Sequence, residues 1–501
     1  MMRVLFTHSY FLRFDPKQWK QQQPYPPLAT LYAAAALREQ GYDVALFDTM
    51  FAQGPEALVS KMESWNPDVL VVYDDGFNFL TKMCLTNMRE AAFNMCSKAR
   101  SKGCRVVVCS SDATDRYDLY LDHGAEFIVT GEGEITLGEL MHQLKEGKEL
   151  PETIDGLIFR RDGVTVKNRK REVLRDLDSL AMPAWDLVDI KEYKKRWMKS
   201  SGYFSLNIST TRGCPFHCNW CAKPIYGNRY HAHSPQHVVA ELKLLTGTLG
   251  ADHIWMTDDI FGLKPGWVGE FADLVNTEKL KFRFKIQSRV DLLLQENTVD
   301  ALARAGCETA WVGAESGSQK ILDAMDKGTK VEQIYEATRQ LKKHGIRPAF
   351  FLQFGYPGET REDIDATLDM VTELMPDDIG VSVSYPLPGT KFYDRVADQL
   401  RENGKTNWTD SDELAVLFQS TFPAPFYKEL QRYLHKHFRM KQGLDAWKRL
   451  TQAPAHVRGS DLKRIAAISY HLPGMFLHGR RMKTLGKSKR TSTELHRDGT
   501  L

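Results

Sequence analysis

Three cysteines stand close together near the middle of the chain. Cys214, Cys218 and Cys221 have the spacing C-x3-C-x2-C. Three thiolates on one short loop can bind three irons of a cubane and leave the fourth iron open. A structural zinc site would need a fourth ligand, and His217 and His231 are the only close candidates. Buried free thiols are the third alternative, and we favour the iron–sulfur cluster.

The other cysteines are scattered along the chain, and a reducing compartment makes a disulfide framework an unlikely use for them. We expect them to be buried free thiols, which is the common state of an isolated cysteine. They are Cys84, Cys96, Cys104, Cys109 and Cys307.

The composition sets broad limits on the function. The chain has 501 residues, and its 67 basic and 64 acidic residues give a net charge of +3, so nothing in the overall charge calls for a nucleic-acid partner. No apolar run approaches the roughly 18 residues of a membrane span. The N-terminus has no signal-peptide pattern. We therefore expect a cytoplasmic protein of two to four domains.

The cysteine loop lies within a regular alternation of strands and helices. Strands are expected at 205–210, 253–257, 282–287, 309–314, 348–354 and 380–385, with helices between them. Six such units predict a partial parallel (β/α)6 barrel, whose chemistry lies at the carboxyl ends of the strands. The loop follows the first of these strands directly.

A second alternating region precedes the barrel. Continuous apolar strands and intervening helices over 1–145 predict a doubly wound, Rossmann-like α/β domain. Residues 146–200 read as a hairpin around Asp162-Gly163 and a linker. The barrel is expected over 201–395, a mainly helical region over 396–485 with a break at Pro473-Gly474, and a disordered basic tail over 486–501.

The cysteine loop resembles the signature of radical S-adenosylmethionine (radical SAM) enzymes, including the aromatic Trp220 before the third cysteine. In that family the open iron of a [4Fe-4S] cluster binds the amino and carboxylate groups of S-adenosylmethionine. Electron transfer then cleaves this cofactor to a 5'-deoxyadenosyl radical. The resemblance implies an electron donor such as ferredoxin or flavodoxin.

Further positions at predicted strand ends match the family in order and imply contacts to S-adenosylmethionine. The resemblance assigns the ammonium group to either Asp258 or Asp259, the carboxylate to the Gln287–Arg289 segment, and the ribose to Glu315 and Ser316. It assigns the adenine to the turn with Gly355 and Pro357, with backbone contacts from Tyr226 and Gly227. Each motif alone is a common turn or helix cap, and their order along the chain is what favours the family.

The N-terminal region resembles the cobalamin-binding domain of one radical SAM subclass. The resemblance implies contacts from Ser110, Ser111 and Asp112 after one strand, and from Gly131 and Glu132 after the last. The D-x-H-x-x-G motif, whose histidine ligates cobalt, is missing. Cobalamin is therefore expected to bind without that histidine, and the alternative is a degenerate domain that binds no corrinoid.

The resemblance implies a cobalamin-dependent radical SAM enzyme that acts on an unactivated carbon of a small-molecule or lipid-like substrate. Its relatives methylate, as methyltransferases, or form rings, as the anaerobic magnesium-protoporphyrin monomethyl ester cyclase does. The alternatives are a methylthiotransferase and a non-catalytic cobalamin or iron–sulfur sensor.

The C-terminal region contains an apolar, aromatic stretch at 465–477, followed by basic residues from Arg480 to Arg490. One interpretation is a helix packed on the barrel and a solvated tail. The other is a peripheral membrane contact, in which apolar side chains enter the interface and cations meet anionic headgroups.

Overall fold

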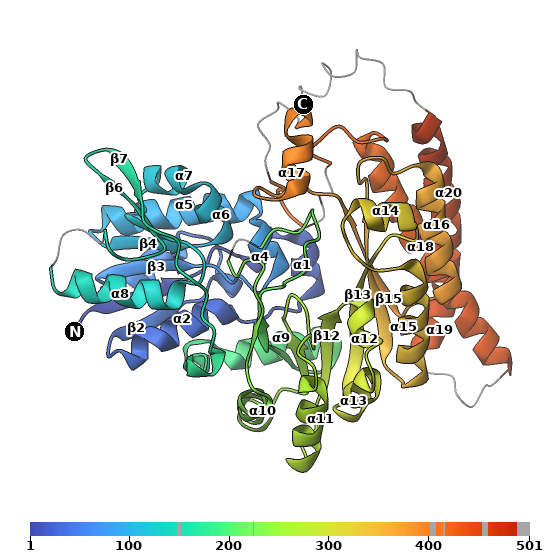
Figure 1. The fold of residues 1–501 in the computed structure, drawn as a ribbon, viewed down its shortest axis with the longest axis horizontal. Helices are drawn as coiled ribbons and strands as arrows, with labels where there is room; N and C mark the ends of the chain where they lie inside the picture. Colours follow the sequence, from blue (N-terminus) through green and yellow to red (C-terminus); the bar gives the residue numbers. More distant parts are fainter. Residues whose placement is uncertain are drawn as a thin grey trace.

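The computed structural model describes residues 1–147, 152–223, 225–400, 407–411, 413, 416–452 and 459–487. Two parallel sheets lie side by side, each covered by helices, and a bundle of long helices flanks the second sheet (Figure 1). The predicted α/β architecture is confirmed. No helix among the described residues is long and apolar enough to cross a membrane.

The N-terminal sheet has the strand order β2-β1-β3-β4-β5-β6-β7. Its parallel strands are β1 (Arg3–Thr7), β2 (Asp43–Phe47), β3 (Val69–Tyr73), β4 (Arg105–Cys109) and β5 (Phe127–Val129). The hairpin β6 (Leu157–Arg161) and β7 (Val164–Lys167) joins antiparallel to β5. The hairpin expected in the connecting segment is thus part of this sheet.

Helices cover both faces of this sheet, as its two-faced apolar strands require. Alternate strand residues divide between two cores, with Val4 and Phe6 in one and Leu5 in the other. The helices include α2 (Leu28–Glu39) and α8 (Gly133–Lys145), which pack together, and α3 (Ala57–Trp65) and α5 (Thr86–Ser101), which also pack together. Short helices α4 (Phe79–Met83), α6 (Ser111–Asp115) and α7 (Tyr117–Asp122) complete the domain.

The second sheet is the predicted six-stranded, all-parallel partial barrel, in the order β15-β14-β13-β12-β11-β8. Its strands are β8 (Ser205–Ile208), β11 (His253–Met256), β12 (Arg283–Ser288), β13 (Cys307–Glu315), β14 (Arg347–Phe354) and β15 (Asp378–Val383). The helices between them are α10 (Pro235–Lys243), α11 (Trp267–Thr277), α12 (Val290–Leu293), α13 (Thr298–Arg304), α14 (Gln319–Ala324), α15 (Val331–Lys343) and α16 (Arg361–Leu374).

The core of the barrel is continuous with one core of the N-terminal domain. One cluster of buried residues includes Phe6 and Leu37 of the first sheet layer and Leu206 and Ile254 of the barrel. The connecting helix α9 (Ile190–Ser201) contributes Trp197, which is 1% exposed and donates its indole N–H to the Pro24 carbonyl. A shared apolar core fixes the two sheets relative to each other, and with them the space between their carboxyl ends.

The C-terminal region is helical, as expected. After α17 (Lys391–Val396) come α18 (Ala424–Gln452), α19 (Gly459–Ala466) and α20 (Ile468–Lys487). The predicted break at Pro473-Gly474 is wrong, because α20 runs through Pro473. Long-range packing outweighs the local cost of an interior proline: α20 lies against α18, where a Cβ on Gly443 would come within 2.5 Å of Ile468. The basic tail expected at 486–501 lies outside the described residues from 488 onward.

Candidate active site

The cysteine loop leaves the carboxyl end of β8 and is closed at its base by a short antiparallel pair. Strand β9 (Thr211–Arg212) pairs with β10 (His231–Ala232). Gly213 lies between this pair and Cys214 with φ of +81°, and a Cβ there would come within 2.3 Å of the Arg229 carbonyl oxygen. Glycine is therefore the residue that lets the two ends of the loop approach each other.

Cys214, Cys218 and Cys221 are partly exposed free thiols, whereas the five scattered cysteines are all buried. Burial raises the pKa of the thiols of Cys84, Cys96, Cys109 and Cys307, and also of Cys214 and Cys221, so the pKa does not separate the two groups of cysteines. Among the cysteines, only Cys214, Cys218 and Cys221 are both close together in sequence and partly exposed to solvent. These two properties fit the ligands of a [4Fe-4S] cluster.

The zinc alternative finds no support in the geometry. Neither the three cysteines nor His217 and His231 belong to a compact group of three ligand atoms within 4.8 Å of one another in the described part of the chain. A single tetrahedral ion needs such a group, whereas a cubane holds its cysteines farther apart.

Asn219, which sequence reasoning missed, ties the cysteine loop to the rest of the site. Its amide donates to the Ala324 carbonyl at 2.8 Å and accepts from the Tyr356 hydroxyl at 2.8 Å. Its backbone N–H donates to the Met325 carbonyl, and its carbonyl accepts from the N–H of Phe392. A buried asparagine between two cluster cysteines is the only sequence signal for this role.

Arg289 lies directly against the cysteine loop. Its guanidinium is 3.9 Å from Sγ of Cys218, stacks on the Phe216 ring at 3.7 Å and forms a two-point ion pair with Asp291. The Lys327 carbonyl accepts a further hydrogen bond at 2.8 Å. This position beside a cluster thiol suits a residue that meets the cofactor carboxylate, and Gln287 is half-buried two residues earlier on β12.

Glu315 ends β13 in the left-handed region, with φ of +56°, and pairs with Lys327 at 2.7 Å. Both side chains are less than a tenth exposed, and the Lys327 ammonium lies 5.9 Å from the Trp220 ring. Ser316 points elsewhere: its hydroxyl is 3.1 Å from that of Thr367 on α16, and the residue is fully buried. The hydroxyl of Ser316 thus already has a hydrogen-bond partner, and its ribose contact stays a prediction.

The two aspartates after β11 have different environments. Asp258 is 1% exposed and accepts hydrogen bonds from the N–H groups of Thr210 and Thr211 at 2.7 and 2.8 Å. Burial raises the pKa of Asp258 to about 7. Asp259 is exposed and pairs with Lys82 of the N-terminal domain at 2.5 Å. The sequence could not separate these environments, and Asp259 is the accessible carboxylate of the two.

The turn after β14 contains Gly355 and Pro357, which are predicted to contact the adenine. Gly355 has φ of +79°, and its N–H donates to Oε2 of Glu359 at 2.7 Å. Pro357 is exposed at the tip of the turn. Gly227 also has a positive φ. The ring of the preceding Tyr226 stacks on the Phe77 ring of the N-terminal domain, with 5.7 Å between the ring centres.

Two acidic side chains expected to contact cobalamin, Asp112 and Glu132, form ion pairs with arginines. Asp112 forms a two-point ion pair with Arg89 at 2.5 and 2.6 Å and accepts from the Tyr120 hydroxyl. Glu132 pairs with Arg212 at 3.0 Å and is 8% exposed. Arg89 is partly buried and Arg212 is buried, so each carboxylate already has a cationic partner, and its contact to cobalamin stays a prediction.

The remaining contacts expected in the N-terminal domain are small residues. Ser110 caps α6 by accepting from the Ala113 N–H. Ser111 begins that helix and lines the cleft described below. Gly131 has φ of +71°, and a Cβ there would be 3.5 Å from the Ile225 carbonyl oxygen of the cluster loop.

Each histidine of residues 1–147 already bonds or pairs with another residue. His8 follows β1, but its ring nitrogens lie 3.0 Å from Asp48 and 3.0 Å from Thr49. His123 bonds the Leu119 carbonyl, and His142 pairs with Glu146 on α8. The residues present thus fit a corrinoid held without a histidine ligand.

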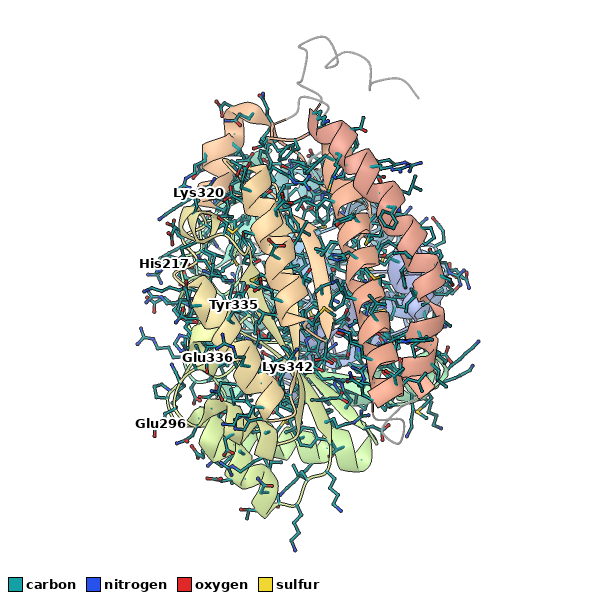
Figure 2. The ribbon with its side chains drawn as sticks, turned by 90° about the vertical axis from the view of Figure 1, so that its right-hand side faces the viewer. His217, Glu296, Lys320, Tyr335, Glu336 and Lys342 are labelled. Carbon is teal, nitrogen blue, oxygen red and sulfur yellow. The ribbon has the colours of Figure 1, made fainter. Side chains whose placement is uncertain are left out.

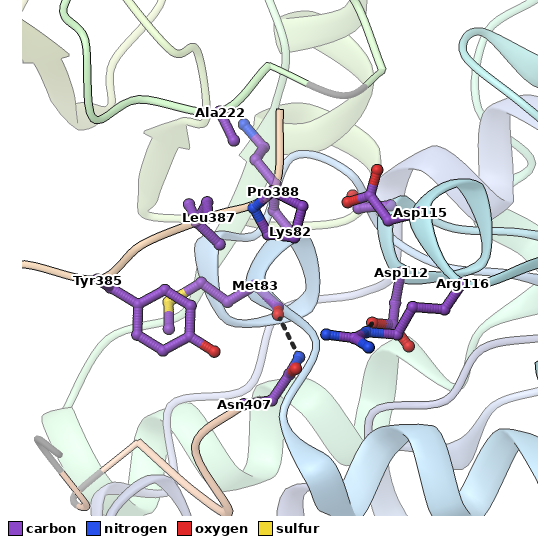
Figure 3. A pocket seen from close by; sticks show the side chains of 11 residues that line it. Lys82, Met83, Asp112, Asp115, Arg116, Ala222, Tyr385, Leu387, Pro388 and Asn407 are labelled. Carbon is purple, nitrogen blue, oxygen red and sulfur yellow. Dashed lines mark hydrogen bonds and ion pairs between the residues drawn. The ribbon is translucent and has the colours of Figure 1, made fainter. Parts of the chain in front are cut away.

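A cleft opens between the two sheets (Figure 3). It is lined by Lys82 and Met83 of α4, Ser111 of α6, Ala222 of the cysteine loop and Tyr385 after β15. On its floor the Asn407 amide donates to the Met83 carbonyl at 3.1 Å. The cleft therefore adjoins Cys221 on one side and the carboxyl ends of the N-terminal strands on the other.

Comparison with known proteins agrees with this geometry. Residues 208–371 match the radical SAM superfamily. The chain carries a radical SAM domain. Enzymes of this family use S-adenosylmethionine and a [4Fe-4S] cluster, and the predicted enzyme class is confirmed.

Two relatives and one solved structure extend beyond the radical SAM domain. An uncharacterised methyltransferase of Pyrococcus horikoshii is 28% identical, over 74% of this chain and 78% of its own. The anaerobic magnesium-protoporphyrin IX monomethyl ester cyclase of Synechocystis is 24% identical, over 81% and 80%. The cobalamin-dependent S-adenosylmethionine radical enzyme OxsB, solved with aqua-cobalamin, is 16% identical with a TM-score of 0.73, over 98% and 74%. It shares the fold of this chain.

Proposed function

We propose that this protein is a cobalamin-dependent radical SAM enzyme that transfers a methyl group to an unactivated carbon of a small molecule. The observation that carries the proposal is the cleft between the cysteine loop and the N-terminal strand ends, which places two cofactor sites next to each other. Relatives named as a methyltransferase and as a ring-forming cyclase both match over about three quarters of this chain or more. Cyclisation is therefore the second candidate.

Each cofactor has a set of residues suited to it. Cys214, Cys218 and Cys221 would hold a cluster that supplies one electron, and the open iron would receive S-adenosylmethionine. Asp259 suits its ammonium group, Arg289 its carboxylate and Glu315 its ribose, because each offers an opposite charge or a charge-assisted acceptor. Ser111, Gly131 and backbone groups near the cleft would contact a corrinoid, whose methyl group would be the one transferred.

The chain's own residues position these groups. Arg289 fixes the cluster loop by stacking on Phe216, and Asn219 fixes it to the turn after β14. Lys82 closes the gap between Asp259 and the N-terminal domain. These contacts hold the loop rigid, as a radical reaction requires if the radical is to meet only its substrate.

Anaerobic turnover with methyl-labelled S-adenosylmethionine tests the proposal. The reconstituted enzyme is given a reductant and a lipid and small-molecule extract, and products are followed by mass spectrometry. Labelled methyl in a product supports methyl transfer, and a product with a new ring and no label indicates cyclisation. Absence of 5'-deoxyadenosine under these conditions would contradict radical SAM chemistry itself.

The methylthiotransferase alternative rested on an N-terminal cysteine-bearing cluster domain and a C-terminal β-barrel. The described residues after β15 form helices rather than a barrel, and the cysteines of the N-terminal domain are separate buried thiols. Neither feature supports that alternative.

A further inference from the structure

Five large apolar side chains stand exposed on the last two helices. Tyr470 is 70% exposed, Phe476 60%, Leu462 55%, Leu477 48% and Leu472 40%. We call these residues the α19–α20 apolar face. Such a concentration of exposed apolar side chains on 16 residues of chain marks an interaction surface, whereas single exposed apolar residues are ordinary.

The opposite side of α20 packs on α18. Figure 2, which views this side of the molecule, shows the two long C-terminal helices side by side along the outside of the barrel helices. Close approach is possible because glycines lie at the contact: Gly443 meets Ile468, Gly474 meets Lys436, and Gly479 meets the ring of Tyr433. The apolar face is therefore what remains outward after α20 has docked on α18.

Positive charge follows the apolar face along the same helix. Residues 462–487 contain six Lys and Arg residues and no Asp or Glu. Arg480, Arg481, Lys483 and Lys487 are exposed one to three turns beyond Phe476. None of these four has an ion pair among the described residues. Tyr470 does contact the chain, because the Lys436 ammonium lies 3.3 Å from the centre of its ring. Exposed apolar side chains and unpaired cations thus share this helix.

The positive charge of this surface indicates which kind of partner binds the apolar face. A second copy of the chain placed on this face would bring two sets of unpaired cations together, which is unfavourable. An anionic bilayer offers both an apolar layer for the aromatic and leucine side chains and phosphate groups for the cations.

We propose that the α19–α20 apolar face docks this protein on the surface of an anionic lipid bilayer. The helix lies in the interface, with Tyr470, Phe476 and Leu477 among the acyl chains and Arg480 to Lys487 at the headgroups. The contact is peripheral, and it is independent of the proposed catalytic chemistry.

Co-sedimentation of the full-length protein with vesicles tests this surface. The vesicles are pure phosphatidylcholine or contain phosphatidylglycerol at increasing fraction. Binding is expected to rise with phosphatidylglycerol and to fall with salt, because screening weakens the cationic contacts. The double substitution Tyr470→Ser with Phe476→Ser should lower the partition coefficient by at least about tenfold. It removes two apolar side chains that would insert among the acyl chains.

The matched control removes two exposed apolar side chains from the N-terminal domain, Leu119→Ser with Val164→Ser, which are 40% and 66% exposed in the native protein. This variant should bind vesicles like the native protein. Phe476→Trp should keep or raise binding, since tryptophan favours the membrane interface. This variant tests the same position without removing its aromatic side chain, so the test does not depend on the folding of the serine variant alone.

Two results would overturn the proposal. One is equal sedimentation of the native protein and the Tyr470→Ser, Phe476→Ser variant with phosphatidylglycerol vesicles. The other is a different oligomeric state for the native protein and this variant in lipid-free sedimentation velocity, together with equal vesicle binding. That result would assign the face to a second copy of the chain.

Discussion

Arg212, two residues before the first cluster cysteine, donates from Nη2 to Oε1 of Glu134 in the N-terminal domain at 2.8 Å. Both side chains are at most 6% exposed, and Glu132 binds the other terminal nitrogen at 3.0 Å. The guanidinium also lies 5.4 Å from the rings of Tyr32 and Tyr226. One arginine thus joins the base of the cysteine loop to the first domain.

Removing that arginine should destabilise the whole chain. Arg212→Met leaves two buried carboxylates without a cation, which costs about 3–5 kcal/mol. Arg38→Met is the matched control, because Arg38 pairs with Asp186 at 2.9 Å across an exposed surface and contributes about 0–1 kcal/mol. Urea unfolding followed by circular dichroism measures both. Equal midpoints for the two variants would show that the buried network carries no net stability.

The cluster assignment predicts a sharp division among the cysteines. Cys214→Ala, Cys218→Ala or Cys221→Ala should each remove most of the bound iron and abolish 5'-deoxyadenosine formation. Cys84→Ala and Cys307→Ala should leave both nearly unchanged, because these thiols are buried in the cores. Iron analysis and chromatography of the anaerobic reaction give the two measurements. Cofactor cleavage by a triple Ala variant would refute the assignment.

Glu315 should contribute to S-adenosylmethionine binding through charge-assisted hydrogen bonds. Glu315→Gln keeps the shape of the side chain and should weaken binding by about 1.5–3 kcal/mol in anaerobic calorimetry. Glu308→Gln is the control, since Glu308 lies at the other end of β13 and pairs with Arg283 and Arg347. Lys327→Met separates the loss of the ion pair from the loss of the ribose contact. Unchanged affinity in a folded Glu315→Gln protein would make Glu315 structural.

The engaged histidines of the N-terminal domain predict a spectroscopic signature. Paramagnetic resonance of cob(II)alamin in the holo-protein should lack nitrogen superhyperfine splitting. His8→Gln should give the same spectrum, because both ring nitrogens of His8 are already bonded to Asp48 and Thr49. Splitting that disappears in the His8→Gln variant would instead identify His8 as a cobalt ligand.

Periodicity and spacing were enough to predict the six barrel strands, the doubly wound domain and the cysteine loop, because these depend on local patterns. Contacts between distant segments were not predictable in this way. Lys82 and Asp259 are 177 residues apart, and nothing local marks either as a partner. Pro473 shows the opposite failure, since a valid local rule was outweighed by the packing of α20 on α18. The choice between Asp258 and Asp259 likewise depended on which side chain the fold buries.

Glu359, in the turn after β14, predicts a pH dependence of stability. The side chain is fully buried, Oε2 accepts from the Gly355 N–H, and Oε1 has no partner among the described protein groups. Burial raises the pKa of Glu359 from 4.5 to about 8. Between these values the folded protein binds a proton that the unfolded chain has released, so stability falls as pH rises through this window. Glu359→Gln has no proton to lose, and its stability relative to the native protein should therefore grow from pH 5 to pH 8.

Urea unfolding of both proteins at intervals across that range measures the difference. Glu362→Gln, in the first turn of α16, is the control: hydrogen bonds from its own backbone N–H and from the Thr360 hydroxyl lower the pKa of this exposed carboxyl, so no comparable trend is expected between pH 5 and pH 8. A difference between native and Glu359→Gln proteins that stays constant or shrinks with rising pH would mean that Glu359 is ionised in the folded state. An ionised carboxylate in this turn would need a positively charged or hydrogen-bonding partner. An added cation or the bound cofactor would be the candidate partner.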